Sequence, residues 1–127
     1  MRNILAKIIF LVHVAIVLTW WGLFFFPLSR WPEKIIFHFY LTMIIVTHQI
    51  IWGLLITPWM GKFRIVCILT TLTQLLRGQS LADDKNYDHS FTREILGKVG
   101  IKGLPHRFSA MMAFVILIIV SIQYFSQ

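Results

Sequence analysis

Two histidines lie within apolar stretches of the sequence that are long enough to cross a membrane, where ionisable side chains are costly and usually functional. His13 lies in the stretch 4–28 and His48 in the stretch 35–57. Because successive spans run in opposite directions, we expect the two imidazoles at a similar depth. Two neutral imidazoles on facing helices could be the axial ligands of haem b. The alternatives are a quinone contact or proton relay by the same pair, or hydrogen bonds to threonine or Gln49 across the helices.

A second pair, Cys67 and His89, could supply the nucleophile and the base of an enzyme that acts on a lipid or an acyl group. Cys67 lies on the polar face of the segment 63–76, which also carries Thr70. The chemistry requires the thiol and the imidazole to lie within about 3–4 Å of one another. The structural alternative is a small buried cysteine beside threonines that hydrogen-bond to their own helix.

Further polar residues stand near the ends of the apolar stretches. His38 lies near the start of the second stretch, two residues before Tyr40, where an amphipathic anchor is the ordinary reading. His106 and Arg107 immediately precede the last stretch, 108–125. The densest polar cluster spans residues 86–91 and contains Tyr87, Asp88 and Phe91. It could bind a divalent cation or a headgroup phosphate, but its spacing matches no metal-loop template, so we expect no metal site.

The elements that must position these residues are three apolar runs, 4–28, 35–57 and 108–125. Each has roughly 18–25 residues, and about 20 helical residues cross the hydrocarbon core of a bilayer. Because backbone amides in lipid find no water, the runs must be helical. The composition, 57% hydrophobic and 13% charged, agrees with a membrane protein. We therefore predict an all-α integral membrane protein with three transmembrane helices in a single domain, 1–127.

The segment 63–76 decides the topology. With about 14 residues and amphipathic spacing, it suits a helix at the membrane interface, followed by a polar segment, 77–107. In that arrangement ten of the 12 Lys and Arg residues share one side, and only Arg30 and Lys34 lie on the other. A four-span alternative would split them eight against four. The positive-inside rule favours three spans, with the N-terminus cytoplasmic and the C-terminus outside.

The net charge of +7 and the single cysteine limit the classes of partner. The basic residues flank apolar helices, so we expect them to contact anionic lipid headgroups, and we expect no nucleic-acid binding. One cysteine excludes an intramolecular disulfide and a Cys-x-x-Cys pair.

Short motifs along most of the chain carry a resemblance to a known family. They are His13 within 11–15, Arg30-Trp31-Pro32, His38, Trp52, Cys67-Ile68-Leu69-Thr70, Leu76-Arg77 and Tyr87-Asp88-His89-Ser90-Phe91. On these motifs the chain resembles a family of small bacterial inner-membrane proteins with three predicted spans and a Cys-Pro-Leu-Thr motif. Ile68 stands where that family has proline. The family has no assigned activity, so the resemblance implies the architecture and the bacterial inner membrane, and it draws attention to Thr70, Arg77 and Phe91.

Three functions follow from these observations as expectations. The first is a non-enzymatic membrane protein that works through contacts, as a homo-oligomer or as an accessory subunit of a membrane complex, because three helices with few small residues bury little of their own surface. The second is a redox protein that holds haem b or a quinone at His13 and His48. The third is a membrane-surface enzyme that uses Cys67 and His89.

Overall fold

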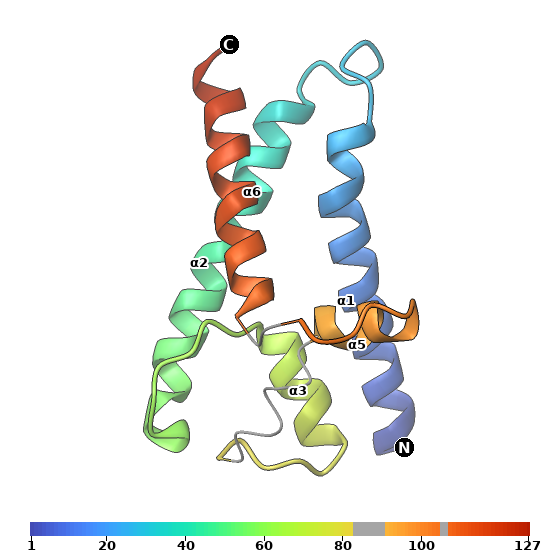
Figure 1. Ribbon diagram of the computed structural model, residues 1–127, viewed down its shortest axis with the longest axis vertical. Coiled ribbons are helices and arrows are strands. Elements are labelled where there is room, and N and C mark those ends of the chain that lie inside the picture. The colour runs from blue at the N-terminus through green and yellow to red at the C-terminus, as the bar shows by residue number, and fades with distance from the viewer. Residues whose placement is uncertain (83–90, 105–106) are drawn as a thin grey trace.

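The computed structural model describes residues 1–82, 91–104 and 107–127. In these ranges the chain is all-helical, as predicted, and three of the helices are long and apolar enough to cross a membrane. The helices are α1 (Arg2–Phe25), α2 (Lys34–Met60), α3 (Ile68–Leu76), α5 (Phe91–Lys98) and α6 (Phe108–Phe125) (Figure 1). The described N-terminal and C-terminal ends lie at opposite ends of the long axis (Figure 1).

The ends of the long helices follow from local backbone chemistry. α1 ends at Phe25, before the predicted limit at residue 28, because Pro27 restricts the residue before it and Phe26 is extended. α2 continues beyond the predicted limit at Thr57 and includes Pro58 in its last turn. It ends where Gly61 adopts a left-handed conformation with φ 70°.

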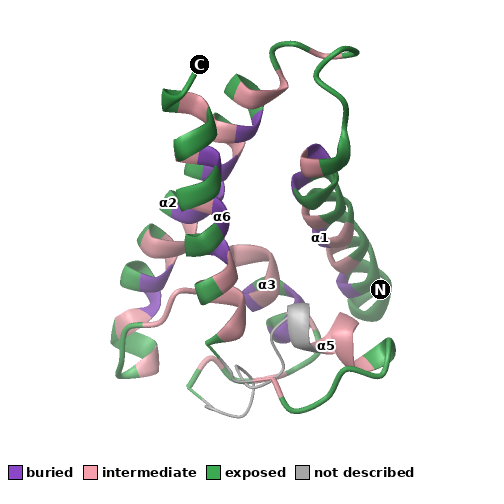
Figure 2. Cartoon of the chain, turned by 45° about the horizontal axis from the view of Figure 1, so that its top comes forward, coloured by how far each residue is buried: buried purple, intermediate pink, exposed green. Residues whose placement is uncertain are grey.

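The long helices do not form an even bundle. α6 packs chiefly against α2, whereas α1 packs chiefly against α3. The core between the spans contains Trp20, Ile45, Val46, Ala113, Ile116 and Val120. In Figure 2 buried residues lie on the facing sides of the helices, and the outward sides are exposed. That distribution suits helices that are surrounded by lipid or by other helices.

The segment 63–76 differs from the prediction in two respects. Only Ile68–Leu76 is helical, and residues 63–67 before it form no regular secondary structure. Moreover, the polar residues of α3 face inward: Thr71, Thr73 and Gln74 are buried, while the leucines of the other side are exposed. The expected stripe of polar side chains at the membrane surface is therefore turned toward the other helices. With nine residues, α3 is about 14 Å long and too short to span the bilayer.

A close approach between two backbones places α3. After Gly61 the chain runs back along α2, so that the carbonyl oxygen of Arg64 lies only 2.0 Å from where a Cβ on Gly53 would be. Only glycine allows this contact. α3 then runs beside the first turns of α1 (Figure 1). There the Arg2 guanidinium donates to the Leu75 carbonyl at 3.2 Å.

Candidate functional site

A polar seam, which is a set of hydrogen bonds between the helices, joins α1 to α2 near the end of the molecule that carries the connection 26–33. The Trp20 indole donates to Thr42 Oγ1 at 2.8 Å, and the Thr42 hydroxyl donates to the His38 carbonyl at 2.7 Å. Thr42 is fully buried. An indole N–H inside a membrane needs an acceptor, and a threonine at the same depth on the next helix supplies it.

The His38 ring completes this seam. It is 2% exposed and lies edge-on to Phe24, with the ring centres 4.6 Å apart. One ring nitrogen hydrogen-bonds to the Trp20 backbone, and Nε2 has no partner among the described residues. The bond is therefore made by Nδ1, and Nε2 carries a buried lone pair. His38 thus links two helices, which goes beyond the role of interfacial anchor expected for it.

Lys34 closes the same end of the molecule. Its ammonium donates to the carbonyls of Leu23, at 2.9 Å, and of Phe26. These carbonyls belong to the last turn and the C-cap of α1 and have no partner in a following turn. Lys34 therefore caps the C-terminal end of α1 from the first residue of α2.

A second polar contact joins α2 to α3. The Trp52 indole donates to Thr71 Oγ1 at 3.1 Å, and the Thr71 hydroxyl lies 3.4 Å from the Cys67 carbonyl. Thr71 is fully buried. This contact repeats the Trp–Thr pairing of the first seam and holds α3 against the second span.

His13 lies in α1 and is buried, and His48 lies in α2 and is half-buried. These positions are compatible with a shared ligand and equally with separate structural contacts. In the described part of the chain no group of three or more His, Cys, Asp or Glu side chains could hold a metal ion.

Cys67 precedes α3 and is partly buried. Burial raises the pKa of the Cys67 thiol, and the backbone amides of Leu69 and Thr70 oppose this rise. A raised pKa leaves less thiolate at neutral pH, which disfavours a nucleophilic role. Its predicted base, His89, lies outside the described residues, as do Tyr87, Asp88 and His106.

The remaining residues that the sequence singled out lie in or beside three different helices, α3, α5 and α6. Arg77 follows α3 and pairs with Glu94 of α5. Thr70 lies in α3 and is half-buried, while Arg107 is the exposed N-cap residue of α6. Phe91 is the first residue of α5, and its side chain is not described. The structure does not gather these residues into one site.

Sequence reasoning missed the hydrogen-bond partners of the buried polar groups. It did not identify Thr42 and Thr71 as the hydroxyl acceptors of the Trp20 and Trp52 indoles. The capping role of Lys34 was also missed. The available signal was an indole and a threonine at equivalent depth on successive helices, because a buried N–H must find an acceptor.

These features define the class of the protein as all-helical, with three helices able to cross a membrane. Tryptophan–threonine hydrogen bonds join α1 to α2 and α2 to α3. Comparison with family models, with curated proteins and with solved structures found no match to this chain.

Proposed function

We propose that this protein is an integral membrane protein of the bacterial inner membrane that works through contacts with other helices, as a homo-oligomer or as an accessory subunit of a membrane complex. The observation that carries the proposal is how little the spans bury in one another. Each span contains an apolar stretch of 18 residues that could cross the membrane. Only 17% of the residues in this stretch are buried in α1, 28% in α2 and 17% in α6. The remaining apolar surface is available to lipid and to further helices.

The proposed orientation places the described N-terminal end in the cytoplasm and the C-terminal end outside. The support is the charge distribution, since ten of the 12 basic residues would lie on the cytoplasmic side. The segment 62–107 carries most of that charge, and it would rest on anionic headgroups or on a partner protein.

Native mass measurement in mild detergent tests the proposal. We expect either a multiple of the 14.9 kDa chain or a stoichiometric companion protein. A monomer that purifies alone would contradict both forms of the proposal.

Cysteine cross-linking then locates the interface. Cys67→Ser removes the only thiol of the chain, so single cysteines can be placed on the outward face of α1 (Leu11, Leu18) and of α6 (Met111, Ile118). A homo-oligomer should cross-link through one of these faces and not through a cysteine at the buried position Val120. No cross-linking from either face, together with a companion protein, would favour the accessory subunit.

A second candidate function is haem b binding by His13 and His48, because both imidazoles lie on long apolar helices and are at least partly buried. It predicts a Soret band in the purified protein that is lost in His13→Ala and in His48→Ala. The matched control is His38→Ala, which removes a buried imidazole from a different seam and should keep the band. A folded protein without visible absorption would end this candidate.

A further inference from the structure

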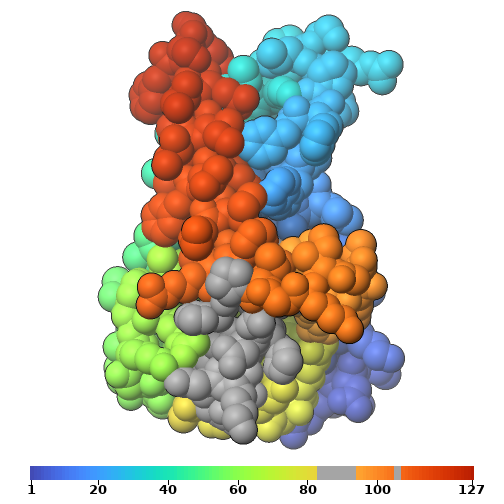
Figure 3. Space-filling model, in the orientation of Figure 1, coloured from blue at the N-terminus to red at the C-terminus, as the bar shows by residue number. Residues whose placement is uncertain are grey.

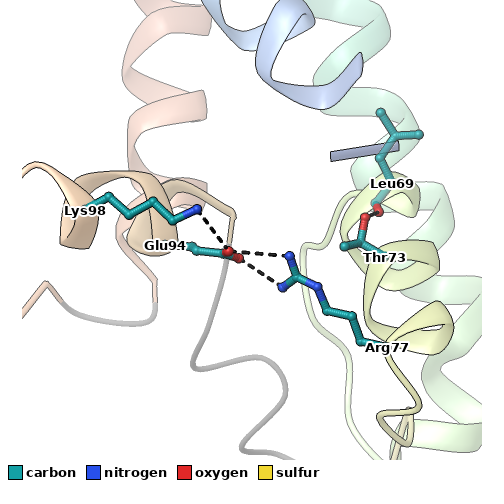
Figure 4. A network of polar contacts seen from close by, with 5 residues as sticks. All are labelled: Leu69, Thr73, Arg77, Glu94 and Lys98. Carbon is teal, nitrogen blue, oxygen red and sulfur yellow. Dashed lines mark hydrogen bonds and ion pairs between the residues drawn. The ribbon is translucent and has the colours of Figure 1, made fainter. Parts of the chain in front are cut away.

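Two cations from different helices lie over one aromatic ring. The Arg77 guanidinium, just after α3, is 5.8 Å from the centre of the Phe10 ring, and the Lys98 ammonium at the end of α5 is 5.1 Å from it. Between them Glu94 accepts from Arg77 at 3.2 and 3.4 Å and lies 3.7 Å from Lys98 (Figure 4). The three charged groups are partly exposed.

The first turns of α1 add two further cations. Lys7 lies one helical turn from Phe10 and therefore on the same side of α1. Arg2 reaches the end of α3, beside an open depression of about 500 Å³ that is lined by Met1, Arg2, Asn3, Leu76, Arg77 and Gly78. We name Arg2, Lys7, Arg77 and Lys98 the basic cluster. Among the described contacts of this cluster, Arg77 and Lys98 pair with the Glu94 carboxylate, and Arg2 donates to a backbone carbonyl.

The position of α5 sets the depth of the basic cluster. α5 lies across α1 near the level at which α6 begins, and it borders the surfaces of α1 and α3 (Figures 1 and 3). Because α5 is short and carries charged side chains, we expect it at the headgroup level and not in the hydrocarbon. Beyond Phe10, α1 exposes apolar side chains such as Leu11, Val12 and Leu18.

We propose that the basic cluster is a binding site for the phosphate of an anionic phospholipid in the leaflet on the α5 side. The inference rests on the membrane placement in the proposed function and adds a defined lipid site to it. The Arg77 guanidinium can donate two hydrogen bonds to one phosphate, and Lys7 and Lys98 supply further positive charge. The acyl chains extend along the exposed apolar side of α1.

Glu94 has a definite part in this arrangement. Its carboxylate pairs with both Arg77 and Lys98, which are the cations that a bound phosphate would contact. The carboxylate therefore competes with the phosphate for these two side chains. Removal of this carboxylate should therefore strengthen lipid binding, although it removes two ion pairs from the protein. A cluster with a purely structural role would not respond in this direction.

Native mass spectrometry of the full chain in mild detergent tests the site. The protein is titrated with phosphatidylglycerol and, separately, with phosphatidylcholine of the same acyl chains. We expect preferential retention of phosphatidylglycerol, and about a fivefold loss of affinity for each charge removed in Lys7→Gln and Lys98→Gln. Glu94→Gln should shift the affinity in the opposite direction.

The matched control removes a positive charge elsewhere. Arg30→Gln alters a residue at the opposite end of the molecule and should bind lipid as the wild type does. An equal loss in this control and in the cluster variants would overturn the site. Displacement of the lipid by inorganic phosphate with the same dependence on the cluster would reassign it to a soluble phosphate and also overturn the proposal.

The same spectra separate this inference from the proposed function. Loss of lipid preference in an intact oligomer would overturn the lipid site alone. A monomer that retains phosphatidylglycerol through the cluster would contradict the contact function and support the lipid site.

Discussion

The indole nitrogen of Trp20 and the hydroxyl of Thr42 lie 2.8 Å apart and join α1 to α2 through a buried hydrogen bond. The same hydroxyl donates to the His38 carbonyl, so one threonine satisfies both a tryptophan and its own helix. Between spans that bury little surface in one another, such a bond fixes the relative height and rotation of the two helices.

A double-mutant cycle measures this bond. Trp20→Phe removes the indole N–H and Thr42→Val removes the hydroxyl, so each should lower the free energy of unfolding. We expect a coupling free energy of about 0.5–1.5 kcal/mol, because the double variant loses the shared bond only once. Reversible unfolding in mixed detergent micelles provides the values. Strictly additive costs would show that the two groups contribute independently.

The close approach of Arg64 to Gly53 predicts that alanine lowers stability at Gly53 but not at Gly22. Gly53→Ala places a methyl group 2.0 Å from the Arg64 carbonyl oxygen, so the segment that contains Arg64 must move. We expect the free energy of unfolding to fall by at least about 2 kcal/mol. Gly22→Ala is the control, since nothing lies within 4 Å of its Cβ and alanine favours helix. Thermal unfolding of both variants decides the matter. Equal stability at the two sites would contradict the close contact.

The environment of Cys67 predicts a shifted pH profile for thiol alkylation. Because burial raises the pKa of the Cys67 thiol, its thiolate forms only at higher pH than in an unfolded chain, whose cysteine has a pKa of about 8.5. The rate with a small alkylating reagent should therefore rise at higher pH in the folded protein than in the denatured one. By linkage, the neutral thiol favours the folded state below the unfolded pKa, and stability declines as pH rises above it. A folded-state profile at lower pH would restore the nucleophile hypothesis.

The cap of α1 predicts a role for Lys34 that depends on its ammonium. Lys34→Met keeps most of the side-chain volume but leaves the Leu23 and Phe26 carbonyls without this donor. We expect a loss of about 1 kcal/mol and fraying of the last turn of α1. Amide hydrogen exchange near residue 25 reports the fraying. The control is Lys102→Met, which changes an exposed lysine and should leave exchange in α1 unchanged.

Sequence pattern alone determined the helical class and the approximate limits of the three spans. Long runs of apolar residues leave the backbone only one way to satisfy its amides in lipid, so this inference needs no knowledge of contacts. The same pattern predicts a common depth for His13 and His48, and this stays a prediction.

Tertiary structure decided which face of the short helix α3 is buried and which residues α5 contacts. The spacing of α3 predicted its two faces, but the inward position of Thr71 depends on Trp52, and the path into α3 depends on the Gly53–Arg64 contact. Arg77 and Lys98 likewise lie over Phe10 and share the Glu94 carboxylate only when α1, α3 and α5 are packed together. Periodicity describes one helix at a time, whereas these relationships are set by contacts between residues far apart in the chain.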